Sequence, residues 1–136
     1  MKNKLPLVAR ILLGGIFFVF GLNGFLNFIP MPTEMPEKMM TFTTGLMATG
    51  YFFPFLKTTE VICGLLLLSG AFVPLALVVL APIILNIFFV HLFLAPDGLP
   101  MALGIGALEI YLAFFASPYK EIVKQLFRCP KCEAKK

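Results

Sequence analysis

The chain has little charge and few of the residues that usually carry chemistry. Among 136 residues there is no tryptophan, one histidine and three cysteines, and 13% are charged. Soluble globular domains carry about 25% charged residues. With 60% hydrophobic residues and a mean hydropathy of +0.95, this chain has too little polar surface to cover itself in water. Its solvent must therefore be lipid, and a soluble globular enzyme is excluded.

The odd number of cysteines does not allow a framework of paired disulfides. Cys63 lies in an apolar run and is most simply a small buried hydrophobic residue. The sequence also has no phosphate-binding Walker loop, no glycine pattern of a dinucleotide-binding fold and no defensible Ser/His/Asp arrangement. The common motifs of soluble enzymes are therefore missing.

The net charge of +4 does not indicate nucleic-acid binding, because the basic residues flank the apolar runs. Only Lys38 and Lys57 lie between the first run and the last, and they are balanced there by Glu34, Glu37 and Asp97. Basic ends and neutral connections follow the positive-inside pattern of membrane proteins. They predict that both termini are cytoplasmic and touch anionic lipid headgroups.

Four apolar runs predict four membrane-spanning helices, since about 20 apolar residues cross a bilayer. We place the spans at residues 5–29, 58–69, 75–94 and 101–116. The second span is short, so it either extends backward past Pro54 or tilts little. The first run is longer than the apolar core of a signal peptide and lacks an obvious Ala-x-Ala cleavage site, so it is read as a retained helix.

A short amphipathic helix is predicted between the first two spans, at residues 34–49. Thr33 is its expected N-cap, Gly50 its expected end, and its apolar residues recur at nearly helical spacing: Met35, Met39, Phe42, Leu46 and Met47. Such a helix lies in the membrane interface; the alternative is a loose loop. The predicted fold is an all-α four-helix transmembrane bundle with this interfacial helix. The membrane domain covers residues 1–119, and a basic cytoplasmic tail covers residues 120–136.

Glu109 is the clearest ionisable residue inside a predicted span. Charged groups in hydrocarbon cost about 2.5–3.5 kcal/mol on insertion scales, so they need a structural or functional reason. Small residues share its helix face in a heptad-like seam, which predicts that the face points into the bundle: Ala102, Gly106, Ala113 and Ala116. Glu109 is then either a hydrogen-bonding lock between helices or a proton or ligand site.

A polar cluster is predicted in the outer half of the bilayer. Antiparallel packing of the spans places Asn23, Asn27, Glu60 and His91 at a similar depth, with the methionine-rich helix and Tyr51 as a roof. A Glu–His pair can relay protons to a quinone or orient a small polar head group. The same residues can instead hold the helices in register, and Glu60 can pair with Lys57.

Asn86 lies deeper than His91 on the third span. Five residues separate the two, so they are expected to point roughly 140° apart and not to share one small site. A lone histidine is more often a core or interface residue than a metal ligand, and no metal centre is expected in the spans. Arg10, near the start of the first span, is expected to extend its side chain to the interface.

Cys129 and Cys132 form a Cys-x-x-Cys pair in the basic tail. One such pair is half of a zinc site and would need a second chain to complete four thiolates. It can also be a redox dithiol, because neighbouring Lys and Arg lower the pKa of a thiol. The third reading is an ordinary reduced tail. No thioredoxin-like βαβ pattern surrounds the pair.

The chain resembles DoxX-family proteins from about residue 10 to residue 119. The resemblance lies in a series of short motifs in a fixed order: ARILLG at 9–14, FVFGLNGFLNF at 18–28, TGY at 49–51, EVICGLLL at 60–67, FVPLA at 72–76, NIFFVH at 86–91 and EIY at 109–111. It implies a four-helix protein of the bacterial inner membrane with a link to respiratory or redox chemistry. A related protein is the membrane subunit of thiosulfate:quinone oxidoreductase. The Cys129–Cys132 tail is not part of the resemblance.

Two functions follow as expectations. The first is a quinone-linked oxidoreductase component with Asn23, Asn27, Glu60 and His91 in its pocket and with Glu109 and Asn86 in support. The quinone or a partner subunit would supply the redox chemistry, because no electron-transfer motif is present. The second is a non-catalytic lipid- or ligand-binding scaffold that recruits a soluble partner. A homodimer is compatible with either function.

Overall fold

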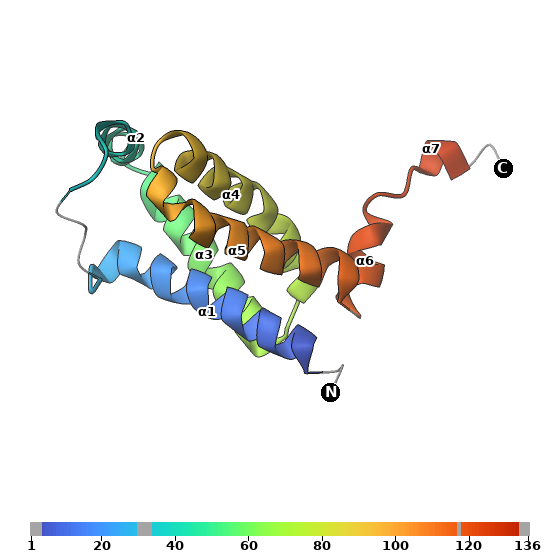
Figure 1. Cartoon of the computed structure of the whole chain (residues 1–136). Coiled ribbons are helices and arrows are strands. Elements are labelled where there is room, and N and C mark those ends of the chain that lie inside the picture. The colour runs from blue at the N-terminus through green and yellow to red at the C-terminus, as the bar shows by residue number, and fades with distance from the viewer. Residues whose placement is uncertain (1–3, 30–33, 117, 134–136) are drawn as a thin grey trace.

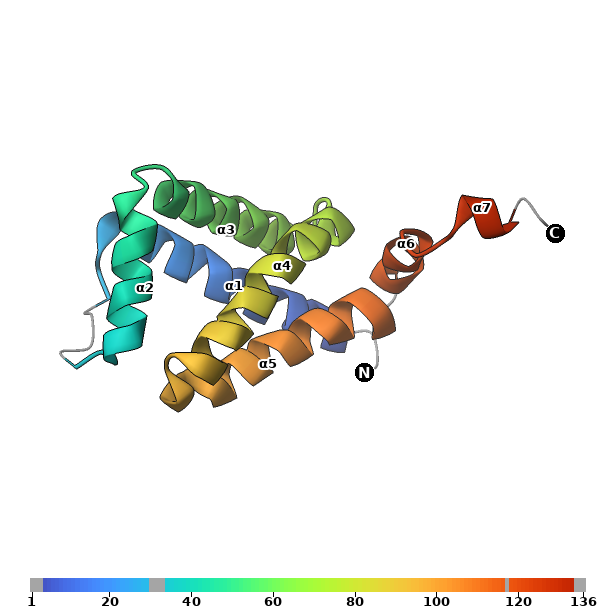
Figure 2. The same cartoon turned by 90° about the horizontal axis from the view of Figure 1, so that it is seen from above.

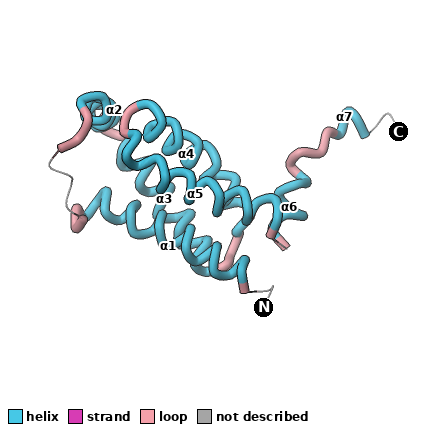
Figure 3. The backbone as a smooth tube through the Cα atoms, in the orientation of Figure 1, coloured by secondary structure: helices cyan, strands magenta, loops and turns pink. Residues whose placement is uncertain are grey.

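The computed structural model describes residues 4–29, 34–116 and 118–133, and within these ranges it contains helices and no strands. Four helical segments are long and apolar enough to cross a membrane. They are α1 (Leu5–Leu26), α3 (Phe52–Ser69), α4 (Val73–Phe93) and the segment Pro96–Phe115. They pack into one bundle, with short turns between α3 and α4 and between α4 and the last span and a longer connection between α1 and α3 (Figures 1 and 3). The all-α four-helix transmembrane prediction is confirmed.

The second span is longer than the predicted core at residues 58–69. Helix α3 begins at Phe52 and includes Pro54 within its first turn, where a missing backbone N–H costs no helical hydrogen bond. The first span ends at Leu26 instead of residue 29, because Asn27 adopts the left-handed conformation with φ 52°. Asparagine tolerates this conformation better than most residues and so ends helices.

The last span is not a single regular α-helix. A short 3-10 turn, η1 (Pro96–Gly98), leads into α5 (Leu99–Ile110), and a π-helical turn, η2 (Tyr111–Phe115), follows. The backbone N–H of Ala116 donates to the carbonyl of Tyr111 across this wider turn, at 2.9 Å. Such turns often mark functional positions in helices. Nothing in the sequence had predicted the π-helical turn.

The predicted amphipathic helix is present as α2 (Glu37–Ala48), and Gly50 follows it with φ 78°. It begins after Pro36 and is shorter than the predicted 34–49; the expected cap Thr33 lies outside the described residues. Figure 2 shows α2 lying crosswise at one end of the bundle. Met39, Phe42 and Leu46 face the bundle, whereas Met47 is exposed.

Close contact between α1 and α3 forms one side of the bundle. A Cβ built on Gly64 would lie 2.6 Å from the backbone nitrogen of Phe18, and one on Gly14 would lie 2.8 Å from Cβ of Leu67. Only glycine allows two helices to approach this closely. Gly15, by contrast, faces open space.

The basic tail begins within a helix. Helix α6 (Tyr119–Gln125) packs against α4 and η2 through the buried Val123, and a last helix, α7 (Pro130–Glu133), extends away from the bundle in Figure 1. The start of α1 and helix α6 lie at one end of the bundle, and α2 and η1 lie at the other. We call these ends the tail end and the α2 end.

Candidate functional site

A polar cavity lies at the α2 end, enclosed by α1, α2, α3, α4 and α5, with a volume of about 240 Å³. Most of its wall is apolar. Its polar lining residues are Thr43, Lys57, Glu60, Asn86 and His91. Helices α3 and α4 thus bring two charges, an amide and an imidazole to one small space.

Lys57 and Glu60 form an ion pair along one turn of α3. The Lys57 Nζ donates to Glu60 Oε2 at 3.2 Å, and Glu60 is buried with 4% of its surface exposed. The stem of Lys57 crosses to α1, where it lies against Gly24, and its ammonium lies 5.6 Å from the centre of the Phe53 ring. The ring face attracts the cation. The pairing of Glu60 with Lys57 that the sequence allowed is present.

His91 is held at the end of α4 by the turn that follows. Its ring packs on Gly98, and its Nδ1 lies 3.3 Å from the carbonyl oxygen of Ala95. A carbonyl only accepts hydrogen bonds, so Nδ1 is the donor in this contact. The role of Gly98 as the support of this ring was not predicted from the sequence.

Asn86 and His91 line the same cavity, although their helical spacing predicted that they would point apart. The reason is that the cavity extends along α4 for more than one turn, from Asn86 through Ile87 and Val90 to His91. A cavity that extends along a helix axis can be lined by residues that point in several directions around that helix.

Three other residues of the predicted cluster lie outside the lining of this cavity. Asn23 instead holds the turn that follows α1, because its Oδ1 accepts a hydrogen bond of 2.7 Å from the backbone N–H of Ile29. Asn27 is exposed in the left-handed turn, and Tyr51 is exposed with 68% of its surface accessible. The roof is therefore α2 itself, through Met39, Phe42, Thr43 and Leu46.

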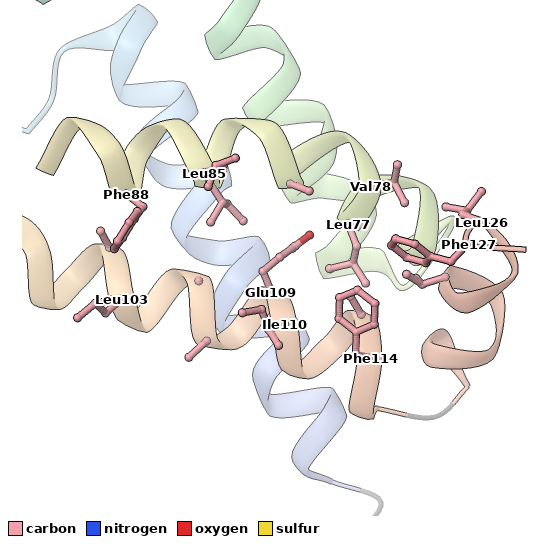
Figure 4. Close-up of a pocket in the computed structure, with 17 residues that line it drawn as sticks. Leu77, Val78, Leu85, Phe88, Leu103, Glu109, Ile110, Phe114, Leu126 and Phe127 are labelled. Atoms are coloured by element: carbon pink, nitrogen blue, oxygen red, sulfur yellow. The ribbon is translucent and has the colours of Figure 1, made fainter. Parts of the chain in front are cut away.

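Glu109 does not line the polar cavity; it lines a second hollow, which we call the apolar groove. It is buried, with 7% of its surface exposed, and the seam residues Ala102, Ala113 and Ala116 are buried beside it. Figure 4 shows its carboxyl between α4 and α5. Three of the four small seam residues thus lie on a face turned into the bundle, as predicted, whereas Gly106 is half-buried and has open space beside it.

Arg10 does not simply extend to the interface. Its Nη1 donates to the hydroxyl of Tyr119 at 3.3 Å, and the guanidinium packs on Gly70, which has φ 80° in the turn between α3 and α4. The residue therefore joins α1 to α6 and to this turn at the tail end.

The two tail cysteines are exposed and lie beside each other across the start of α7. The Cys132 thiol donates a hydrogen bond to Cys129, and this lowers the pKa of Cys129 and raises that of Cys132. Arg128 forms a bidentate ion pair with Glu133, in which Nε donates to Oε1 at 2.9 Å and Nη2 donates to Oε2 at 3.0 Å. No group of three potential metal ligands occurs in residues 4–29, 34–116 or 118–133.

These features define a multi-pass membrane protein with a small polar cavity under an amphipathic helix. The family model described as DoxX matches residues 5–92, which is more than half of the chain. The chain belongs to the DoxX family. No curated protein and no solved structure matches it.

Proposed function

We propose that this protein is a membrane component of a bacterial redox or respiratory system and that its polar cavity binds the head group of a quinone. The observation that supports the proposal is the gathering of Lys57, Glu60, Asn86 and His91 around one cavity at the α2 end of a four-helix bundle. Buried ionisable groups within spans are a mark of functional sites.

The cavity offers partners for both oxidation states of a quinone ring. The Lys57 ammonium and the Asn86 amide can donate to carbonyl oxygens, as an oxidised quinone requires. The Glu60 carboxylate and the Nε2 atom of His91 can accept from hydroxyl groups, as a quinol requires. A bound quinone supplies two-electron and two-proton chemistry. The residues of this chain would orient the ring and exchange its protons, while a soluble partner would exchange its electrons.

The size of the cavity favours a head group over a whole molecule. Pockets that enclose drug-sized ligands measure about 300–1,000 Å³, and this cavity measures about 240 Å³. A single substituted ring fits such a volume, and an isoprenoid tail would extend between the helices into lipid. The apolar lining from α1 and α2 suits the ring faces.

The orientation we propose places the tail end in the cytoplasm and α2 at the outer surface of the inner membrane. Basic residues Lys120, Lys124 and Arg128 at the tail end support it through the positive-inside rule. A membrane-impermeant maleimide should label Cys129 and Cys132 in inside-out vesicles and leave them unlabelled in intact spheroplasts. Labelling in spheroplasts would reverse the orientation. Buried Cys63 serves as the internal control.

The quinone proposal is tested by mass spectrometry of the small molecules that remain bound to detergent-purified protein, with a visible absorption spectrum beside it. We expect a quinone in stoichiometric amount. We expect it to be lost or reduced about tenfold or more in His91→Ala and Asn86→Ala, since each removes a polar partner.

A matched control is Thr58→Ala, which truncates an exposed residue of α3 that does not line the cavity. It should retain the quinone. If the wild-type protein carries only bulk phospholipid, or if all three variants lose quinone equally while remaining helical, the proposal fails.

A non-catalytic role is the second candidate, and one observation favours it. The polar groups of the predicted cluster already have structural partners: Glu60 has Lys57, Asn23 has the Ile29 amide and His91 has the Ala95 carbonyl. In this alternative they hold the helices in register, and the protein is a lipid- or ligand-binding scaffold that recruits a partner, alone or as a homodimer. His91→Ala would then lower the thermal stability of the bundle without releasing a ligand.

A further inference from the structure

The apolar groove is larger than the polar cavity, with a volume of about 760 Å³ against about 240 Å³. It runs between α4 and α5 and is bounded at the tail end by α6. Its wall is made of aliphatic and aromatic side chains, among them Phe88, Phe114 and Phe127. The volume lies within the range of pockets that enclose drug-sized ligands.

Glu109 is the one ionisable residue in the lining of this groove. Its Oε2 atom is buried and has no hydrogen-bond partner in the part of the chain that the structure describes. Figure 4 shows the carboxyl extending from α5 into the space in front of α4. A buried carboxyl group without a partner is costly, so this atom needs a donor or a positive charge from outside the chain.

The backbone that follows Glu109 forms part of the groove wall. The π-helical turn η2 begins two residues after Glu109 and turns Ala113 and Phe114 into the groove wall. At the tail end the rings of Phe114 and Phe127 lie 5.8 Å apart and join η2 to the segment after α6. Three separate helical segments therefore form the groove, and the Glu109 carboxyl is the ionisable group in its lining.

We propose that the apolar groove binds a lipophilic cation, with Glu109 as its counterion. The carboxylate complements a single positive charge, and the apolar wall complements a hydrophobic body around that charge. Aromatic ring faces such as those of Phe88 and Phe114 add further attraction for a cation. The ligand class is an amine, quaternary ammonium or phosphonium that carries aromatic or aliphatic groups.

Two other kinds of occupant complement the groove less well. A lipid acyl chain would fill the apolar wall and leave Glu109 without a donor. A helix from a second copy of the chain has its backbone N–H groups engaged in its own hydrogen bonds, so its backbone would leave Glu109 unpaired as well. A lipophilic cation complements both the apolar wall and the carboxylate.

Binding of radiolabelled tetraphenylphosphonium to the purified full-length protein, measured by equilibrium dialysis in detergent, tests the proposal. We expect saturable binding at one site per chain. Glu109→Gln keeps the shape and removes the charge, and we expect it to weaken binding by about tenfold or more. Glu109→Asp, which retains the charge, should lose less.

Glu37→Gln is the matched control, because it makes the same chemical change at an exposed residue of α2. It should bind as the wild type does. Ala107→Phe provides a second test that leaves Glu109 intact, since Ala107 lines the groove and a larger side chain would fill it. We expect it to abolish binding, whereas Ala71→Phe in the exposed turn after α3 should not.

Three results would overturn the proposal. The first is equal binding by wild type and a helical Glu109→Gln protein. The second is equal affinity for triphenylphosphine oxide, an uncharged probe with three phenyl rings, because a carboxylate counterion must favour the charged ligand. The third is a wild-type dimer that dissociates in Ala107→Phe, since that result would show that a second copy of the chain occupies the groove.

Discussion

The ammonium of Lys57 lies 3.2 Å from the carboxylate of Glu60, one turn further along α3, and both residues line the polar cavity. The two members of the pair are not equally covered: the Lys57 side chain is 20% exposed and that of Glu60 only 6%. The carboxylate is therefore the more deeply buried member of the pair.

Lys57→Met should destabilise the bundle, because it leaves Glu60 buried without its counterion. Removal of one partner from a buried pair costs about 3–5 kcal/mol. Because Lys57 is partly exposed, we expect the lower part of this range or less, about 1–3 kcal/mol. Thermal unfolding in detergent, followed by circular dichroism, measures the change.

The double variant Lys57→Met/Glu60→Gln should recover part of that loss, because neither charge is then left alone. If the single and double variants have the same melting temperature, the unpaired Glu60 carboxylate does not lower stability, because it is hydrated through the cavity. Lys38→Met on the exposed side of α2 provides the control for loss of a lysine charge.

Gly64→Ala should separate α1 from α3. The added Cβ would lie 2.6 Å from the backbone nitrogen of Phe18 and 2.9 Å from the carbonyl oxygen of Gly14, and neither backbone atom can move without shifting its helix. Overpacking of this kind costs about 1–3 kcal/mol. Gly15→Ala should leave the melting temperature unchanged or raise it, since nothing lies within 4 Å of its added Cβ. Equal melting of the two variants would contradict the close packing of α1 on α3.

The fold was largely predictable because hydrophobicity and proline positions act locally. Four apolar runs set four spans, and the spacing of Met39, Phe42 and Leu46 set the face of α2. The helix limits were less predictable, because tertiary contacts and single residues decide them. Asn27 ended α1 early in a left-handed turn, and Pro54 was accommodated in the first turn of α3.

The site was only partly predictable, because depth in the membrane does not fix direction around a helix. Similar depth grouped Asn23 with Glu60 and His91, yet the Asn23 side chain turns back to the Ile29 amide. A spacing of five residues separated Asn86 from His91, yet a cavity that runs along α4 includes both. The groove that Glu109 lines includes residues of α6 and of the segment after it, and the basic tail did not predict that packing.

Tyr119→Phe should loosen the tail end of the bundle. The variant removes the hydroxyl that accepts from Arg10 Nη1, and the Arg10 Nε is already buried without a partner in the described part of the chain. We expect a loss of about 0.5–1.5 kcal/mol in unfolding free energy, the usual net worth of one hydrogen bond. Tyr51→Phe changes an exposed tyrosine in the same way and should have no effect. Proteolysis of α6 in the folded protein gives a second readout, with faster cleavage expected in Tyr119→Phe alone.

Cys129 should be the more reactive thiol of the tail. The hydrogen bond from Cys132 stabilises its thiolate and lowers its pKa, while the pKa of Cys132 is raised by the same contact. At a given pH below the ordinary thiol range, a larger fraction of Cys129 is therefore thiolate, and its alkylation by iodoacetamide should begin at lower pH than that of Cys132. Cys132→Ala removes the donor, so the reaction at Cys129 should move to higher pH and slow at neutral pH. Peptide mapping by mass spectrometry after short exposures separates the two sites, and an unchanged profile in Cys132→Ala would show that the surrounding lysines, and not the neighbouring thiol, set the reactivity.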